Sequence, residues 1–138
     1  MGWMLWTKYL HPEALVFFER DDGFRGEDHF ADLAFTAYKD FYKIERQCLA
    51  QVQSGSVLDV GTGAGRASLY FQNRGIDVLA VDISPGACLL AQTRGTLQVK
   101  QLSVFDLQAV DAAVSAIVMI GNGTTVAQTL PELGDLLR

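Results

Sequence analysis

Apolar residues recur at helical and strand-like spacings along most of the chain. Between positions 28 and 48 they return every three or four residues, with charged residues mostly on the other side of the wheel, which predicts one amphipathic helix. Short β-prone runs occupy 56–60, 76–82, part of 97–102 and 116–120. Between them we expect helices over 66–74 and from Pro85, the second capped by Ser84, with Gly75 and Gly95 just past their ends.

Strands that alternate with helices at this spacing are typical of right-handed crossovers and a parallel sheet. We therefore expect the α/β class, with a doubly wound, mostly parallel sheet and helices on both faces. Residues 1–27 mix aromatic and acidic side chains and form an expected N-terminal arm or lid, which leaves residues 28–138 as the domain.

The last residues predict one more helix. Thr129 and Glu132 have the spacing of a capping box before an apolar run that the sequence cuts off at Arg138. About four strands precede this point, so we expect the chain to hold a truncated domain with one open sheet edge. A second copy could pair with that edge to form a homodimer.

Charge and composition exclude several functions. The chain has 16 acidic and 11 basic residues among 138 and a net charge of −5, so no broad basic surface is expected to bind nucleic acid. It has neither an apolar run near the roughly 20 residues of a membrane helix nor a secretory signal, which favours a soluble cytoplasmic protein. The two cysteines, Cys48 and Cys88, have neither disulfide nor zinc spacing, and no metal site is expected.

Three alternating glycines, Gly61, Gly63 and Gly65, follow the first β-prone run. Such a loop lets the backbone turn tightly from strand to helix and lets a ligand approach the main chain. A dinucleotide loop needs Gly-x-Gly-x-x-Gly, but Arg66 stands where its third glycine would be, and the Gly-Lys-Ser/Thr of a P-loop is missing. The sequence therefore predicts a cofactor loop of a different kind.

Acidic residues follow three successive predicted strands. Asp59, just before the glycines, disfavours a pyrophosphate and suits a ligand with an ammonium or sulfonium group. Asp82, at the end of the next strand, can accept hydrogen bonds from both hydroxyls of a ribose. Asp106 could accept from an adenine amino group while Phe105 or Leu107 packs on the ring. Together they suit an uncharged nucleoside attached to a cation.

These residues, with Gly121 and Asn122 after a later strand, resemble the class I S-adenosylmethionine-dependent methyltransferases over roughly residues 30–138. The resemblance implies that S-adenosylmethionine is the cofactor, with Asp59 and the backbone of Gly61, Thr62 and Gly63 around its methionine part. It also implies Asp82 on the ribose, Ile83 beside the adenine, Asp106 and Leu107 at the adenine edge, and Gly121 and Asn122 near the transferring methyl group. The family sheet has seven strands in the order 3-2-1-4-5-7-6. This sequence departs from it by ending after the fourth strand and by carrying Ser115 where an Asp often opens that strand.

The expected function is methyl transfer from S-adenosylmethionine to a small-molecule acceptor, with no catalytic residue assigned. Two alternatives stay open. One is a truncated, non-catalytic cofactor-binding or scaffold domain that dimerises or needs a partner. The other is an oxidoreductase domain that binds a nicotinamide dinucleotide, against which the glycine spacing and Arg66 argue.

Overall fold

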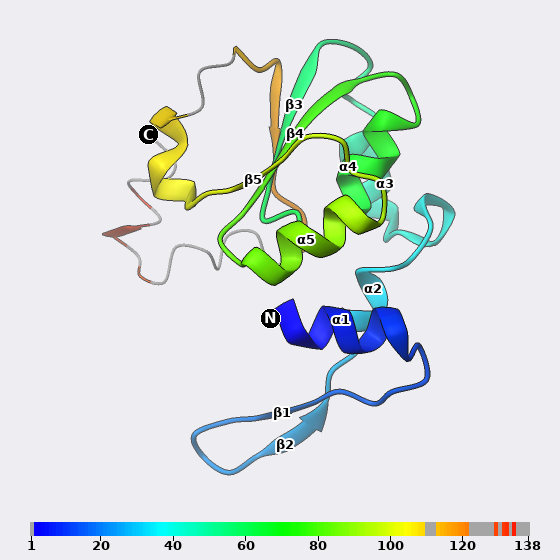
Figure 1. Cartoon of the computed structure of the whole chain (residues 1–138), viewed down its shortest axis with the longest axis vertical. Coiled ribbons are helices and arrows are strands. Elements are labelled where there is room, and N and C mark those ends of the chain that lie inside the picture. Colours follow the sequence, from blue (N-terminus) through cyan, green and yellow to red (C-terminus); the bar gives the residue numbers. More distant parts are fainter. Residues whose placement is uncertain (1, 110–112, 122–128, 130, 133, 135–138) are drawn as a thin grey trace.

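A parallel sheet of four strands lies at the centre of the computed structural model, which describes residues 2–109, 113–121, 129, 131, 132 and 134. Its order is β5-β4-β3-β6, and every neighbouring pair is parallel. The strands are β3 (Ser56–Val60), β4 (Asp77–Asp82), β5 (Val99–Gln101) and β6 (Ala116–Val118). All four expected strands are therefore present, and the parallel pairing of β3, β4 and β5 requires crossover connections between them (Figure 1).

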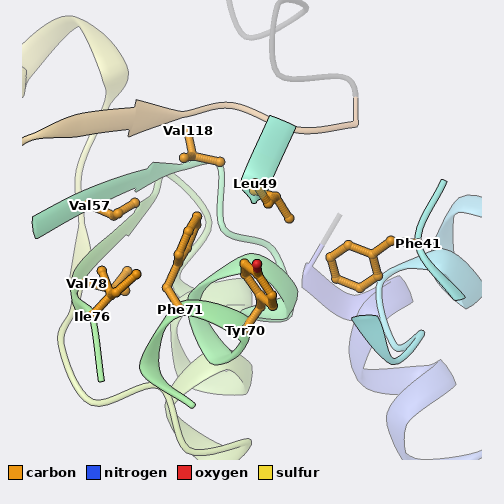
Figure 2. Packing of buried hydrophobic residues seen from close by; sticks show 8 residues of the cluster. All are labelled: Phe41, Leu49, Val57, Tyr70, Phe71, Ile76, Val78 and Val118. Atoms are coloured by element: carbon orange, nitrogen blue, oxygen red, sulfur yellow. The ribbon is translucent and has the colours of Figure 1, made fainter. Parts of the chain in front are cut away.

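Each face of the sheet carries its own apolar cluster, because successive side chains on a strand point to opposite faces. On one face, helices α3 (Lys43–Leu49) and α4 (Arg66–Gln72) pack on the strands. Figure 2 shows this cluster, which comprises Phe41, Leu49, Val57, Tyr70, Phe71, Ile76, Val78 and Val118. On the other face, Leu58, Val60 and Val81 pack against the 3-10 helix η2 (Val104–Ala109) and its neighbours. The doubly wound architecture with helices on both faces is confirmed.

Local sequence fixes the ends of the two crossover helices. Ser84 caps α5 (Pro85–Thr93): its side chain accepts a hydrogen bond from the Ala87 amide, and Pro85 takes the first helical position. Gly75 and Gly95 follow α4 and α5 with φ angles of 73° and 105°, where a glycine avoids the steric cost of a Cβ. Both helix ends lie where the sequence placed them, within two residues.

The single helix expected over 28–48 is wrong. The structure instead has α2 (Phe30–Leu33), the 3-10 turn η1 (Tyr38–Asp40) and α3. The backbone is extended at Ala37 (φ −74°, ψ 156°) and Phe41 (φ −63°, ψ 153°). These breaks let Tyr38 stack on Tyr70 with ring centroids 4.1 Å apart and bury Phe41, so aromatic packing outweighs helical periodicity.

The N-terminal arm consists of helix α1 (Gly2–Leu10) and a hairpin of β1 (Phe17–Glu19) with β2 (Arg25–Glu27). Figure 1 shows α1 beside α5, while the hairpin projects away from the sheet. Lys8 ties α1 to α2 through an ion pair with Asp32 (2.7 Å). Helix α1 therefore contacts both α5 and α2.

Near the other end of the chain, Thr129 and Glu132 make one half of the expected capping box: the Thr129 hydroxyl accepts from the Glu132 amide (3.3 Å), and it donates to the Glu132 carboxylate (2.9 Å). Most of the helix expected after them lies outside the described residues. Within the described part of the chain, no helix has the length and apolar character needed to cross a membrane.

Candidate functional site

The carboxyl ends of β3 and β4 meet at one edge of the sheet, and the glycine loop (residues 61–65) connects β3 to α4 there. Gly61, Gly63 and Gly65 have φ angles of 71°, 56° and 79°, which residues with a Cβ rarely adopt. The amides of Gly61 and Thr62 donate to the Val81 carbonyl (2.8 and 3.1 Å), so the loop is fixed to the neighbouring strand. The expected tight strand-to-helix turn is thereby confirmed.

Asp82 lies at the end of β4 and joins this loop to the next one. One carboxylate oxygen accepts from the Gly63 amide (2.9 Å) and the other from the Ser84 amide (2.9 Å). Each oxygen keeps a second lone pair, and the side chain is half-buried at the rim, so the carboxylate can still accept hydrogen bonds from a diol. Beside it, Ile83 is 71% exposed and offers an apolar surface to a ligand.

Asp59 lies beneath the loop, with only 2% of its surface exposed. One of its carboxylate oxygens accepts from the hydroxyls of both Thr62 (2.8 Å) and Ser68 (2.6 Å). Burial raises the pKa of Asp59, and these two hydrogen bonds partly oppose that rise. The carboxylate therefore holds the loop onto the start of α4 from below.

The remaining expected site residues follow β5 and β6. Asp106 and Leu107 lie in η2; the Asp106 side chain is exposed, while Leu107 packs on the apolar face that includes Leu58. Gly121 follows β6 with a φ of 70°. Asn122 lies outside the described residues. The structure thus joins Asp59, the glycine loop and Asp82 by direct hydrogen bonds, whereas Asp106 lies in η2 after β5 and Gly121 follows β6.

An ion pair that the sequence analysis missed secures the start of α4. The Arg66 guanidinium makes two hydrogen bonds to the Glu45 carboxylate of α3 (2.7 and 3.3 Å), and both side chains are about one-tenth exposed. The guanidinium also lies 4.2 Å above the Phe41 ring. In the sequence, Arg66 is notable only because it stands where a dinucleotide-binding loop has its third glycine. Nothing in the local sequence predicts its pairing with Glu45, 21 residues earlier.

Helix α1 forms a wall beside the glycine loop, which sequence analysis also missed. Leu5 packs with Ala64 of the loop and with Ala87 and Leu90 of α5. The Trp6 indole donates to the Gly86 carbonyl (2.9 Å), at the first turn of α5. The available sequence signal was the spacing of Gly2, Leu5, Trp6 and Tyr9 at three to four residues, which is typical of one helical face.

The space above the loop is open. Among the described residues, a Cβ built on Gly61 would meet no atom within 4 Å, and one on Gly63 would meet only Leu5 Cδ1 at 3.9 Å and the Gly61 carbonyl oxygen at 4.0 Å. A ligand can therefore approach the backbone there, bounded by α1 and within reach of Asp82. The described part of the chain contains no cluster of His, Cys, Asp and Glu that could hold a metal ion.

Comparisons with known proteins identify the family and the fold. A family model described as a methyltransferase domain matches residues 57–138. The structure of an S-adenosylmethionine-dependent methyltransferase from Bacteroides fragilis, in complex with S-adenosyl-L-homocysteine, is similar with a TM-score of 0.77 and 28% identity. That match covers 95% of this chain and 54% of the other.

A sugar N-methyltransferase from Streptoalloteichus shares the fold, with a TM-score of 0.63 and 20% identity over 77% of this chain and 45% of the other. This chain spans about half the length of each of these two structures. No curated protein matches it.

Proposed function

Because this chain belongs to the methyltransferase domain family, we propose that it binds S-adenosylmethionine at the edge formed by the glycine loop and Asp82, and that it takes part in methyl transfer. The observation that carries the proposal is the hydrogen bond from the Gly63 amide to the Asp82 carboxylate. It brings the loop and the acid together under open space. The similar methyltransferase from Bacteroides fragilis, crystallised with S-adenosyl-L-homocysteine, supports this choice of ligand.

The residues fit the ligand by their chemistry. Asp82 would hold the ribose hydroxyls, with Ile83 beside the adenine and Asp106 and Leu107 at its edge. The backbone of Gly61, Thr62 and Gly63 would lie along the methionine part. Asp59 fixes the loop from below, and its carboxylate would make the electrostatic potential at the loop more negative. Gly65 would allow the close approach of the loop to α5, and Gly121 and Asn122 would lie near the reacting methyl group.

When bound, S-adenosylmethionine supplies a sulfonium methyl group to a nucleophile that attacks in line with the carbon–sulfur bond. The contribution of this chain is to hold the cofactor in one orientation, which is the main requirement of such a displacement. Its net charge of −5 favours a small-molecule acceptor over nucleic acid. No residue is assigned as a general base.

Calorimetric titration with S-adenosylhomocysteine tests the proposal. We expect micromolar binding by the chain and a loss on the order of 100-fold in Asp82→Ala, because two charge-assisted hydrogen bonds to the ribose disappear. Asp77→Ala is the matched control: Asp77 is exposed at the opposite end of the same strand and should leave the affinity unchanged.

Two results would contradict the proposal. A folded chain that binds neither S-adenosylmethionine nor S-adenosylhomocysteine would favour the non-catalytic scaffold alternative. Binding of a nicotinamide dinucleotide in their place would favour the oxidoreductase alternative.

We also propose that the free edge of β6 can pair with a second copy of the chain. Among the described residues β6 has only β3 as a neighbour, and Ile117 on it is largely exposed. Size-exclusion chromatography with light scattering would detect the resulting homodimer, and a compact monomer at high concentration would contradict it.

A further inference from the structure

Arg94, the C-terminal cap of α5, contacts two parts of the molecule that are far from it in sequence. Its guanidinium donates to the carbonyl of Ala64 in the glycine loop (2.5 Å) and, from the same nitrogen, to the carbonyl of Ala34 (3.1 Å). It also lies 4.9 Å above the ring of Phe35. One side chain therefore fixes the loop to the segment that follows α2.

A row of aromatic rings extends this contact to α1. Phe35 stacks on Tyr9 with ring centroids 6.2 Å apart, and Tyr9 meets Trp6 edge to face at 5.8 Å. Trp6 in turn donates to Gly86 at the other end of α5. The wall beside the glycine loop is thus attached to both ends of α5, and Arg94 makes one of the two attachments.

The environment of Arg94 is unusual for an arginine with a purely electrostatic role. Burial lowers its pKa, and among the described residues no carboxylate forms an ion pair with it. Its polar partners are backbone carbonyls, so Arg94 fixes the main chain at these two places rather than a flexible side chain. Because the Ala64 carbonyl accepts a hydrogen bond from Arg94, the peptide group between Ala64 and Gly65 is held in one orientation.

From this geometry we propose that Arg94 is a positioning residue for the cofactor. It holds the glycine loop and the N-terminal wall in the one relative position that accepts S-adenosylmethionine. This rests on the proposed function for the identity of the ligand, but the effect on the loop itself can be observed without any ligand.

The test compares Arg94→Met, which keeps the aliphatic stem and removes the donors, with Arg94→Lys, which keeps the charge on a shorter reach. We expect the Kd for S-adenosylhomocysteine to rise about tenfold in the Met variant and about threefold in the Lys variant. In the ligand-free protein, amide hydrogen exchange at Gly65 and Trp6 should speed up, while exchange in β3 and β4 stays unchanged.

Arg74→Met is the matched control. Arg74 also lies over an aromatic ring, that of Tyr70, and donates to its hydroxyl, but it is at the far end of α4 from the loop. It should alter neither affinity nor exchange at Gly65. Arg94→Met could instead lower the melting temperature and leave both the Kd and the exchange at Gly65 unchanged. That result would mean that Arg94 only stabilises the fold, and it would overturn the proposal.

Failure of the two proposals can be told apart. If the parent chain binds no S-adenosylhomocysteine, the proposed function fails, and the exchange rates at Gly65 and Trp6 decide the positioning role alone. Faster exchange in Arg94→Met and not in Arg74→Met supports that role, and equal rates overturn it.

Discussion

Asp59 shows what burial does to a single carboxylate. The sequence suggested a charge facing a cationic ligand, whereas the side chain is buried and accepts hydrogen bonds from the hydroxyls of Thr62 in the glycine loop and Ser68 in α4. Desolvation favours the protonated form, so the folded protein binds this proton more tightly than the unfolded chain does. Stability therefore depends on pH through this residue.

The sign of that dependence can be predicted. Between the ordinary pKa of 3.8 and the raised value in the folded protein, the folded state holds more protons, so the Asp59 contribution to the free energy of unfolding falls as pH rises. Asp59→Asn keeps an oxygen for Thr62 and Ser68 and removes the titration. Urea denaturation from pH 4 upward should show the parent losing stability relative to the variant. Parallel curves for the two proteins would contradict the prediction.

Gly65 combines a positive φ with a tight contact. A Cβ built on it would lie 2.4 Å from the Thr96 hydroxyl oxygen, whereas one on Gly75, which also has a positive φ, would meet nothing within 4 Å. We expect Gly75→Ala to cost about 1 kcal/mol and Gly65→Ala ~3 kcal/mol or more. Guanidinium denaturation of both variants measures the difference, and equal losses would show that the contact with Thr96 is unimportant.

A second background isolates the cause of the larger loss. The Thr96 hydroxyl is buried without a hydrogen-bond partner, so Thr96→Ala removes the obstructing atom without breaking a bond in the described structure. Gly65→Ala should therefore cost less in the Thr96→Ala background than in the parent.

At the residue scale, sequence reasoning found the parts of the site that are local. The spacing of the glycines and the position of Asp82 at a strand end follow from strand-to-helix geometry. Arg94 and Glu45 were missed because their partners lie 30 and 21 residues away in sequence, and only the packed fold brings them together.

Between elements, the ion pair of Arg66 and Glu45 joins α3 to the start of α4. Removing one partner leaves the other charge buried and unpaired, so Glu45→Gln should cost about 3 kcal/mol in the free energy of unfolding. Glu19→Gln removes a similar pair with Arg25 on the exposed hairpin and should cost less than ~1 kcal/mol. Equal losses in chemical denaturation would mean that burial of the first pair has no energetic effect.

The type of an element was predictable where its local hydrophobic pattern had no competing long-range packing. The strands β3 and β4 are short apolar runs that glycines or acids terminate, and both were placed within one residue. The helix predicted over 28–48 is wrong because Tyr38 and Phe41 occupy positions that fit a helical face, yet with extended backbone on either side Tyr38 stacks on Tyr70 and meets Phe41 edge to face.

At the scale of the whole molecule, α1 packs beside the glycine loop, and we predict that it forms part of the site. Leu5→Ala removes a side chain that is 3% exposed at the junction of α1, α5 and the glycine loop. We expect a loss of about 3 kcal/mol in stability and weaker binding of S-adenosylhomocysteine, because the cavity loosens the wall. Denaturation and calorimetry on the same samples measure both.

Leu10→Ala is the control on the same helix, because Leu10 is 62% exposed and its truncation should change stability by less than about 0.5 kcal/mol. If Leu5→Ala lowers stability and leaves ligand affinity at the parental value, α1 supports the fold without forming part of the site.

The attachment of α1 to α5 also has a consequence for the order of events during synthesis. Trp6 and its partner Gly86 are separated by 80 positions, so α1 is synthesised well before the surface of α5 on which it packs. Until α5 has formed, the residues of α1 that pack on it lack that partner. Docking of α1 on α5 closes a long loop, which makes it a late step in folding. Trp3 is 89% exposed, so in a Trp3→Phe background the fluorescence of Trp6 would report the moment at which the helix finally docks.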